Sequence, residues 1–228
     1  MKVIVFSALL TMSNALFGSD VNSLSITELK QEILDIAAAN TERLDNFKEV
    51  RGKLDPLVKA LKAKGDQSVQ ERVEGKVGSW QQLWTDDSDD TRPNNFFSQI
   101  DRSRTFQVVD PSGFFYNVSE MRTAIKLRLT VFLRGTYAKQ GEGISIKFTN
   151  IDIKALGTKD ITETTYKLEN KEEKFFAATR FSEYPNGPVG AEGYIDTVYV
   201  DDEMRVDYGY NTVDEVVDLF VLKRIQGR

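Results

Sequence analysis

Carboxylates are the residues best placed to do chemistry in this chain, because it contains neither histidine nor cysteine. Their absence excludes an imidazole base, a thiolate nucleophile, disulfides and the usual zinc ligands. The acidic residues include two dense runs, DDSDD from Asp86 to Asp90 and DDE from Asp201 to Glu203. Three kinds of role remain for them: calcium binding, acid–base catalysis, or no reaction chemistry at all.

The first acidic run does not fit a calcium loop. Counted from Asp86, the sixth position of an EF-hand loop is Thr91 instead of glycine, and the twelfth is Phe97 instead of glutamate. We interpret the run as a solvated loop, and we expect neither a metal nor another cofactor.

The second acidic run offers paired carboxylates. Asp201, Asp202 or Glu203 could act as a general base, but three adjacent acids at a turn are more typical of a charged surface. A carboxylate-dependent enzyme is therefore the less favoured alternative. The formal net charge of −5 also argues against a nucleic-acid partner, which calls for an excess of clustered basic residues.

Residues 1–17 resemble a targeting leader. A lysine at position 2 precedes the apolar run from Val3 to Met12, and small residues follow at Ser13 and Ala15. The alternative is a buried first strand. The run is too short to span a bilayer.

Residues 24–74 are expected to form a short helical region. Ser25 and Glu28 have the spacing of a capping box, and an apolar stripe that includes Leu29 and Ile33 predicts a helix over about residues 26–44. Asp55 and Pro56 suit a fresh helix start, and Gly65 suits a left-handed C-cap. Two or three packed helices are therefore expected.

Residues 75–226 change to the period-two pattern of strands. In the clearest segment, Ile125 to Arg134, apolar residues from Ile125 to Leu133 alternate with Lys126, Arg128, Thr130 and Arg134, so one face is expected to be buried and the other wet. Other predicted strands are 77–85, 105–109, 113–118, 143–153, 174–181, 194–200, 203–208 and 219–225. Eight or nine short strands without intervening helices predict a mainly β fold, an antiparallel barrel.

The strand GSWQQLWT holds both tryptophans of the chain. In a regular strand Trp80 and Trp84 share a face, and we expect both to point into the barrel. Aromatic residues are frequent in the strands, and a wide interior lined by them would suit a long apolar molecule: Phe106, Phe114, Phe115, Tyr116, Phe148, Phe175, Phe176 and Tyr199. The alternative is that they are ordinary core residues of a filled barrel.

Arg205 lies on the face opposite to Met204, Val206 and Tyr208, together with Asp207. It is either exposed to solvent, the slightly favoured interpretation, or paired with an acid inside the barrel and available to a ligand headgroup. Arg224 could close one end of the barrel by stacking on Trp80.

Several segments together resemble the plastid lipid-associated proteins, also called plant fibrillins. These segments are LKQEILDIAAANTERLD, GSWQQLWTDD, FQVVDPSGFFYNVSEM, YVDDEMRVDYGY and LFVLKR. The likeness runs from Leu24 to Arg224, so residues 24–226 are expected to be one fibrillin-like domain. The resemblance implies a lipocalin-like β-barrel that binds, stores or shields a prenylquinone, carotenoid or acyl lipid at thylakoids or plastid lipid globules. It does not imply an enzyme.

Carried over by position, Trp80 matches the tryptophan of the family's first strand, and Trp84 stands where the family has tyrosine. Tyr199 and Arg205 match the family's acidic C-terminal motif. The stretch from Asn211 to Asp218 is longer and more acidic than the turn expected there. The predicted ligand-binding residues are Trp80, Trp84, Phe106, Tyr116, Tyr199 and Arg205.

The leader and the family together predict a location. The working hypothesis is delivery to the plastid through the secretory pathway, by a bipartite leader that begins with a signal peptide. The alternative is a secreted or lumenal protein. A second possible role is a structural scaffold at thylakoid or globule surfaces, with a filled barrel and surface-binding amphipathic helices.

Overall fold

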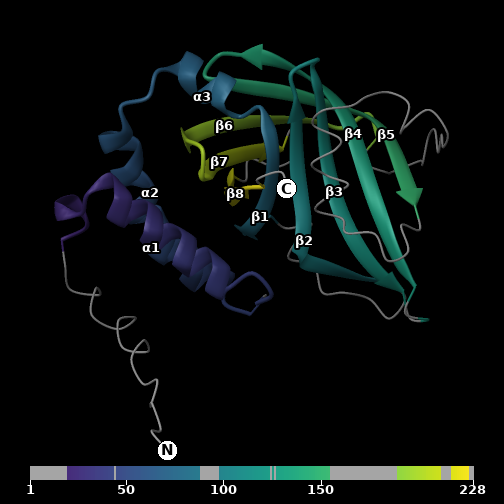
Figure 1. Ribbon diagram of the computed structural model, residues 1–228, viewed down its shortest axis with the longest axis horizontal. Coiled ribbons are helices and arrows are strands. Elements are labelled where there is room, and N and C mark those ends of the chain that lie inside the picture. The colour runs from purple at the N-terminus through teal and green to yellow at the C-terminus, as the bar shows by residue number, and fades with distance from the viewer. Residues whose placement is uncertain are drawn as a thin grey trace, which may run out of the picture.

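The computed structural model describes residues 20–43, 45–87, 98–123, 125, 127–154, 189–211 and 217–225. These residues form a closed antiparallel barrel of eight strands with helices packed on one side, as Figure 1 shows. The helical elements are η1 (Val21–Ser23), α1 (Ile26–Ala39), α2 (Phe47–Gly65) and α3 (Val69–Gly75). The strands are β1 (Gly78–Thr85), β2 (Ser98–Asp110), β3 (Phe114–Thr123), β4 (Arg128–Gln140), β5 (Gly143–Lys154), β6 (Glu192–Val200), β7 (Met204–Asn211) and β8 (Val217–Arg224).

Each strand pairs with its neighbour in sequence, and β8 pairs with β1 to close the barrel. The predicted mainly β, antiparallel barrel behind an N-terminal helical region is therefore confirmed. The predicted strand 174–181 and the leader at residues 1–17 lie outside the described residues. Among the described residues, no helix combines the length and the apolar character needed to cross a membrane.

The start of α1 confirms the capping box. The Ser25 hydroxyl accepts a hydrogen bond from the Glu28 backbone N–H at 3.3 Å, and the Ser25 N–H donates to the Glu28 carboxylate at 2.7 Å. These bonds satisfy backbone groups that the first turn of a helix leaves unpaired.

Two expectations for the second helix are wrong. Pro56 lies inside the continuous helix α2 and does not begin a new one, because Leu54, Leu57 and Leu61 keep the helix packed across the missing hydrogen bond. The left-handed cap is Asp66, with φ of 45°, and not Gly65. Gly65 is required for another reason, since a Cβ there would lie 2.9 Å from the Tyr199 ring.

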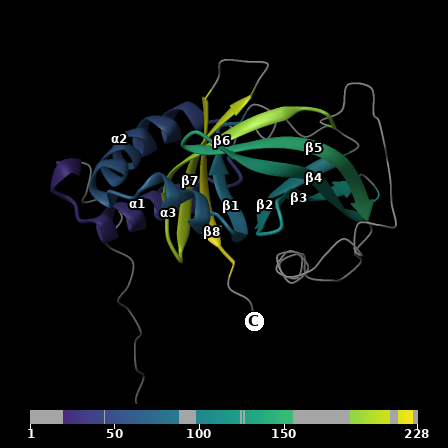
Figure 2. The ribbon, with the colours of Figure 1, turned by 90° about the horizontal axis from the view of Figure 1, so that it is seen from above.

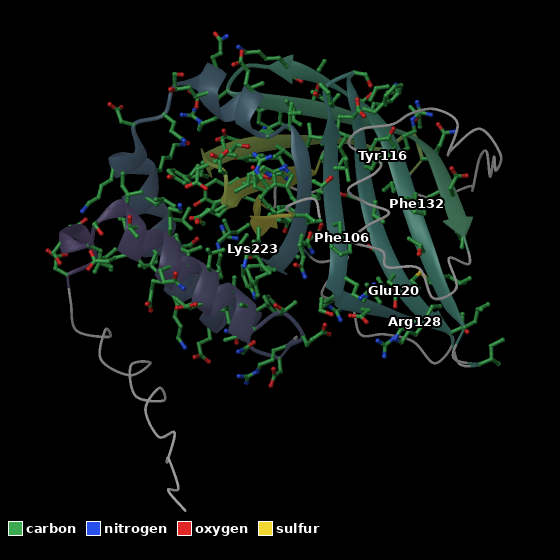
Figure 3. The ribbon with its side chains drawn as sticks, in the orientation of Figure 1. Phe106, Tyr116, Glu120, Arg128, Phe132 and Lys223 are labelled. Atoms are coloured by element: carbon green, nitrogen blue, oxygen red, sulfur yellow. The ribbon has the colours of Figure 1, made fainter. Side chains whose placement is uncertain are left out.

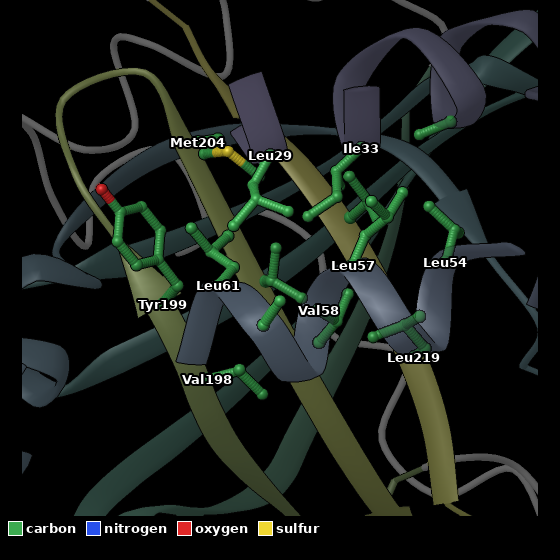
Figure 4. Close-up of a cluster of buried hydrophobic side chains, with 14 of the residues drawn as sticks. Leu29, Ile33, Leu54, Leu57, Val58, Leu61, Val198, Tyr199, Met204 and Leu219 are labelled. Carbon is green, nitrogen blue, oxygen red and sulfur yellow. The ribbon is translucent and has the colours of Figure 1, made fainter. Parts of the chain in front are cut away.

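Helices α1 and α2 bury one apolar cluster against the barrel wall. Figure 4 shows Leu29 and Ile33 of α1 facing side chains of α2 and of the strands beneath. The members from the strands are Trp84, Val198, Tyr199, Met204, Val206, Leu219 and Val221. Because both helices lie outside the barrel in Figures 1 and 2, these strand residues point outward.

Register then identifies the side chains that point inward, because directly paired residues share a face. Arg205 and Asp207 alternate with the outward Val206, so they point inward. Arg205 is paired with Val200 and Leu222. Trp80 is paired with Arg224 and Gln107. From Gln107 the same inner face continues through Asn117 and Leu133 to Ile151.

The alternation predicted for residues 125–134 is confirmed only in part. Leu129, Val131 and Leu133 are half-buried on the inner face, but Ile125 and Leu127 are exposed because they belong to the turn before β4. Thr130, expected to be wet, is buried next to the outward Phe132.

The cluster beneath α1 predicts a sharp difference between two isoleucines. We expect Ile33→Ala to lower the free energy of unfolding by about 2 to 5 kcal/mol, since it leaves a cavity in a packed core. The matched control Ile125→Ala, at a side chain that is 84% exposed, should change it by less than about 0.5 kcal/mol. Urea unfolding followed by circular dichroism measures both, and equal effects would contradict the packing described here.

Candidate functional site: the barrel interior

The end of the barrel that lies next to α3, which we call the α3 end, is closed. The first residue of β1, the last of β2 and the first of β3 meet there. Val73 of α3 and Val77 pack against an inward apolar cluster that includes Phe115 and Ile144. Phe115 also lies edge-on to Phe148, with ring centroids 6.3 Å apart. This end of the interior is filled by side chains.

Trp80 lies just inside the α3 end and is fully buried. Its indole N–H donates a hydrogen bond to the Lys76 carbonyl at 2.7 Å. The Arg224 guanidinium stands 4.1 Å from the centre of its ring, which confirms the predicted stacking. Arg224 also donates to the carbonyls of Val77 and Gly75, at 3.1 and 3.0 Å, so the last strand is tied to the α3–β1 junction.

Arg205 points into the barrel and is 0% exposed, so the slight preference for solvent exposure was wrong. The reason is that α1 and α2 occupy the other face of β7 and leave the interior for the alternate residues. The Arg205 Nε lies 2.8 Å from Asp207 Oδ2, and the guanidinium stands 5.1 Å from the Trp80 ring. Gln107 Oε1 accepts a hydrogen bond from Arg205 Nη2. Burial lowers the pKa of Arg205, and the charge of Asp207 opposes that shift.

The partners of Arg205 occupy only some of the hydrogen-bond donors of its guanidinium. The ion pair with Asp207 is close but too poorly aligned to count as a hydrogen bond, and Nη1 has no hydrogen-bond partner in the described part of the chain. Asp207 is itself fixed by the Thr197 hydroxyl, which donates to Oδ1 at 2.5 Å. Arg205 is therefore a fully buried cation with a donor left over.

Lys76 adds a second cation beside this pair. It is 1% exposed, and its ammonium donates to the Ile195 carbonyl at 3.0 Å. Burial lowers the pKa of Lys76 to about 8, with the nearby Asp207 opposing that shift and Arg205 reinforcing it. We refer to Lys76, Trp80, Gln107, Thr197, Arg205, Asp207 and Arg224 as the interior polar cluster.

The opposite end of the barrel, where the β3–β4 turn lies, is called here the hairpin end. Most of its inward side chains are apolar and only half-buried: Met121, Leu129, Val131, Leu133 and Ile151. The polar Asn117 and Ser119 lie beside them on β3. Ile153, next along the same face, is 42% exposed. The inner surface therefore changes from charged and fully buried at the α3 end to mainly apolar and accessible at the hairpin end.

The structure brings together two of the six predicted ligand-binding residues, Trp80 and Arg205. Trp84 does not point inward as expected, because a register shift between Gln82 and Trp84 turns it to the helix side. A similar shift between Thr197 and Tyr199 turns Tyr199 to that side too. Both bulges were invisible to a strict period-two interpretation.

Phe106 and Tyr116 lie in a different cluster. Their positions alternate with Gln107 and Phe115, so they occupy the outer face of β2 and β3, next to Phe132. Figure 3 shows the three aromatic residues on neighbouring strands. Of the other aromatic residues expected to line the interior, Phe115 and Phe148 do so, Phe114 packs on the outer cluster, and Phe175 and Phe176 lie outside the described residues.

Sequence reasoning missed Lys76 and Gln107 as members of the site. Lys76 precedes the strand, so no alternation pattern applied to it, and Gln107 is one polar residue among apolar neighbours in β2. That polar break within FQVV is the signal that could have identified Gln107 as an inward partner for a buried charge.

The acidic turn between β6 and β7 is held by ion pairs. Lys30 of α1 lies 2.5 Å from Asp201 and 2.7 Å from Glu203. Burial alone would raise the pKa of Asp201, but hydrogen bonds from Lys30 and two backbone N–H groups bring it below its usual value. This turn fastens α1 to the barrel.

The start of the other acidic run is also not a free loop. The Asp86 carboxylate lies 2.6 Å from the Arg51 guanidinium and accepts a hydrogen bond from the Leu219 N–H at 2.7 Å. Asp86 therefore joins α2 to β8, and at this residue the interpretation as a solvated loop was wrong. Within the residues that the structure describes, no group of three or more acidic side chains could hold a metal ion.

The buried ammonium of Lys76 predicts a pH dependence of stability. The pKa rises from about 8 in the folded chain to its ordinary value of 10.5 in the unfolded chain, so between these pH values the unfolded state binds more protons. The stability of the wild type relative to Lys76→Met should therefore rise with pH by up to about 1.4 kcal/mol per unit. Urea unfolding at pH 7, 8, 9 and 10 measures this difference.

The exposed residue Lys139 provides the control for this experiment. Lys139→Met should show a flat difference from the wild type over the same pH range. A flat difference for Lys76→Met would contradict the burial of a charged amine at this position.

Comparison with protein families links this fold to a group of proteins. The PAP_fibrillin family model matches residues 27–222, from the first helix to the last strand. Comparisons with curated proteins and with solved structures gave no match. The matched region covers most of the chain and is consistent with a barrel that carries helices at its N-terminal side. The chain belongs to the PAP_fibrillin family, the plastid lipid-associated proteins.

Proposed function

We propose that this protein binds a hydrophobic small molecule inside its barrel and so stores or shields it. The ligand class is a prenylquinone, a carotenoid or an acyl lipid, and the place is a thylakoid or lipid-globule surface of a plastid. Membership of the plastid lipid-associated family supports association with plastid lipids in general. The barrel interior supports the binding of a hydrophobic small molecule inside it.

The observation that carries the proposal is the accessible apolar stripe at the hairpin end. Leu133 and Ile151 continue the inner face that begins at Trp80, yet they remain half-buried instead of being packed away like Phe115. Apolar side chains that point into a barrel and still contact solvent gain free energy when a hydrocarbon chain covers them, at about 25 cal/mol per Å² removed from water.

The contrast between the two ends of the interior suits an amphipathic or elongated ligand. The hydrocarbon part would lie against the apolar stripe, and the head would reach toward Trp80 and Arg205. A few placed polar groups in a mostly apolar site are typical of small-molecule sites.

The scaffold alternative has less support. It calls for amphipathic helices with an apolar face free for a lipid surface. In α1 and α2 that face is already buried: Leu29, Ile33 and Leu54 are all fully buried against the barrel. The carboxylate-enzyme alternative is weakened because Asp201 and Glu203 are engaged by Lys30.

The hairpin end is the part of the barrel best suited to meet a lipid surface. Three of the four large hydrophobic side chains that are exposed in the described residues gather there, namely Ile125, Leu127 and Ile153. They continue the apolar stripe of the interior, so a ligand could pass between a lipid layer and the barrel with little exposure to water.

Delivery of the chain to the plastid belongs to the same proposal. Residues 1–17 lie outside the described residues, and their signal-peptide character supports entry through the secretory pathway as the first step of a bipartite route.

Ligand binding can be tested by the fluorescence of Trp80. In a Trp84→Phe background Trp80 is the only tryptophan, and it stands inside the barrel. Titration with plastoquinone, a carotenoid and oleic acid should give saturable quenching or a spectral shift with at least one of them. The variant Leu133→Asp, which puts a charge on the apolar stripe, should weaken binding about tenfold or more.

A matched control distinguishes binding from surface effects. Thr136→Asp adds the same charge at an exposed position of β4 and should leave the titration unchanged. A Trp80 signal that responds to no lipid of these classes would sink the carrier role.

Surface docking can be tested separately. The double change Ile125→Asp and Leu127→Asp should reduce co-sedimentation with phosphatidylcholine vesicles by about tenfold or more, because charged side chains do not enter the apolar layer. Tyr210→Asp, at an exposed aromatic residue of β7, is the control. Unchanged sedimentation of the double variant would remove the hairpin end as the docking surface.

A further inference from the structure

The interior polar cluster contains more buried positive than negative charge. Lys76 and Arg205 are cations at 1% and 0% exposure, and Asp207, at 0%, is the carboxylate that faces them. The half-buried Arg224 adds a third cation, and it donates to the backbone carbonyls of Val77, Gly75 and Asp201. Among the described residues the cluster therefore holds three cations and one carboxylate, and its fully buried members Lys76, Arg205 and Asp207 alone carry an excess of one positive charge.

Neighbouring acids do not remove this excess. Asp196, which is half-buried on β6, lies 4.0 Å from Lys62 of α2, and the exposed Glu142 lies 3.4 Å from Arg72 of α3. The charge of Asp196 also acts on Lys76, but Lys62 and Arg72 share it, and Glu142 is paired with Arg72. Buried charge without a counter-charge is costly, so the cluster is stabilised by any anion that reaches it.

The donors in the cluster have unused capacity for such an anion. Within the described part of the chain, Arg205 Nη1 is buried without a hydrogen-bond partner, and the Lys76 ammonium, which has three protons, donates to the Ile195 carbonyl. Trp80, with Arg205 and Arg224 both over its ring, holds the two guanidinium groups in place.

We propose that the interior polar cluster binds the carboxylate head of an amphipathic lipid, with Arg205 Nη1 as the principal donor and Lys76 as the second cation. This inference rests on the proposed carrier function and narrows its ligand class to anionic acyl lipids or other lipids that end in a carboxylate. A head with one negative charge offsets the single excess charge of the fully buried members Lys76, Arg205 and Asp207; Arg224 is only half-buried and already donates to the carbonyls of Val77 and Gly75. The hydrocarbon tail then extends along the apolar stripe toward the hairpin end.

The neutral members of the wider ligand class do not meet the same need. A carotene has no hydrogen-bond acceptor, so it would leave Arg205 Nη1 unpaired. The carbonyl of a prenylquinone could accept a hydrogen bond from Nη1, but it brings no charge to offset the excess. A hydrogen bond between two charged groups is about twice as strong as one between neutral groups. The cluster therefore discriminates by the charge of the head more than by the shape of the tail.

The test compares ligands that differ only at the head. The Trp84→Phe protein is titrated at pH 7.4 with oleic acid, methyl oleate and oleoyl lysophosphatidic acid, and the Trp80 signal is followed. We expect oleate to bind about tenfold or more tightly than its methyl ester, since one charge-assisted contact is lost in the ester. We also expect oleate to bind more tightly than the doubly charged phosphate lipid.

Two variants locate the effect. Lys76→Met should reduce the preference for oleate over the ester by several-fold. Replacing the ion pair as a whole, with Arg205→Met and Asp207→Leu, should abolish most of it without leaving an unpaired buried charge. Lys139→Met is the control and should keep the full preference. Circular dichroism confirms that each variant is folded, and the comparison of ligands on the parent protein stands without any variant.

Each other outcome has a distinct meaning. Equal affinity for oleate and its ester would overturn the carboxylate site while leaving the carrier function in place. Tightest binding of the phosphate lipid would overturn the assignment to a carboxylate. If none of the three ligands, nor plastoquinone or a carotenoid, changes the Trp80 signal, both the carrier function and this inference are wrong.

Discussion

The guanidinium of Arg205 sets the constraint on which the interior depends. A charged group that is fully buried calls for partners, and the barrel supplies them from the same strand through Asp207 and from β2 and β1 through Gln107 and Trp80. Thr197 then orients Asp207, and Arg224 covers the other side of the indole. Residues far apart in sequence are thereby brought to one place at the α3 end.

This arrangement is possible because the two faces of the barrel wall have different surroundings. The outward residues of β7 and β8 bury against α1 and α2, so the alternate residues have only the interior to face. The filled α3 end excludes water from the charged groups, while the hairpin end keeps its apolar side chains accessible. A lipid with an acidic head would match both zones at once.

Local patterns in the sequence predicted the element order, the capping box at Ser25 and the barrel, because these depend on neighbours along the chain. They also placed Arg205 and Asp207 on one face, but alternation alone cannot say which face is inside. The inward face is determined by α1 and α2, which precede β7 by more than a hundred residues and cover its outer face. The orientation of Trp84 and Tyr199 was missed for another reason, since a bulge shifts the register by one residue and has no reliable sequence signature.

The most direct test of the account is to identify what the protein carries in its own host. The protein is purified from host membranes without added lipid, and native mass spectrometry is followed by organic extraction of the bound material. We expect one amphipathic lipid with a carboxylate head per chain, lost when Arg205 and Asp207 are replaced together by Met and Leu. A chain that is recovered free of lipid, or that holds only lipids adsorbed in variable number and unaffected by this replacement, would contradict it.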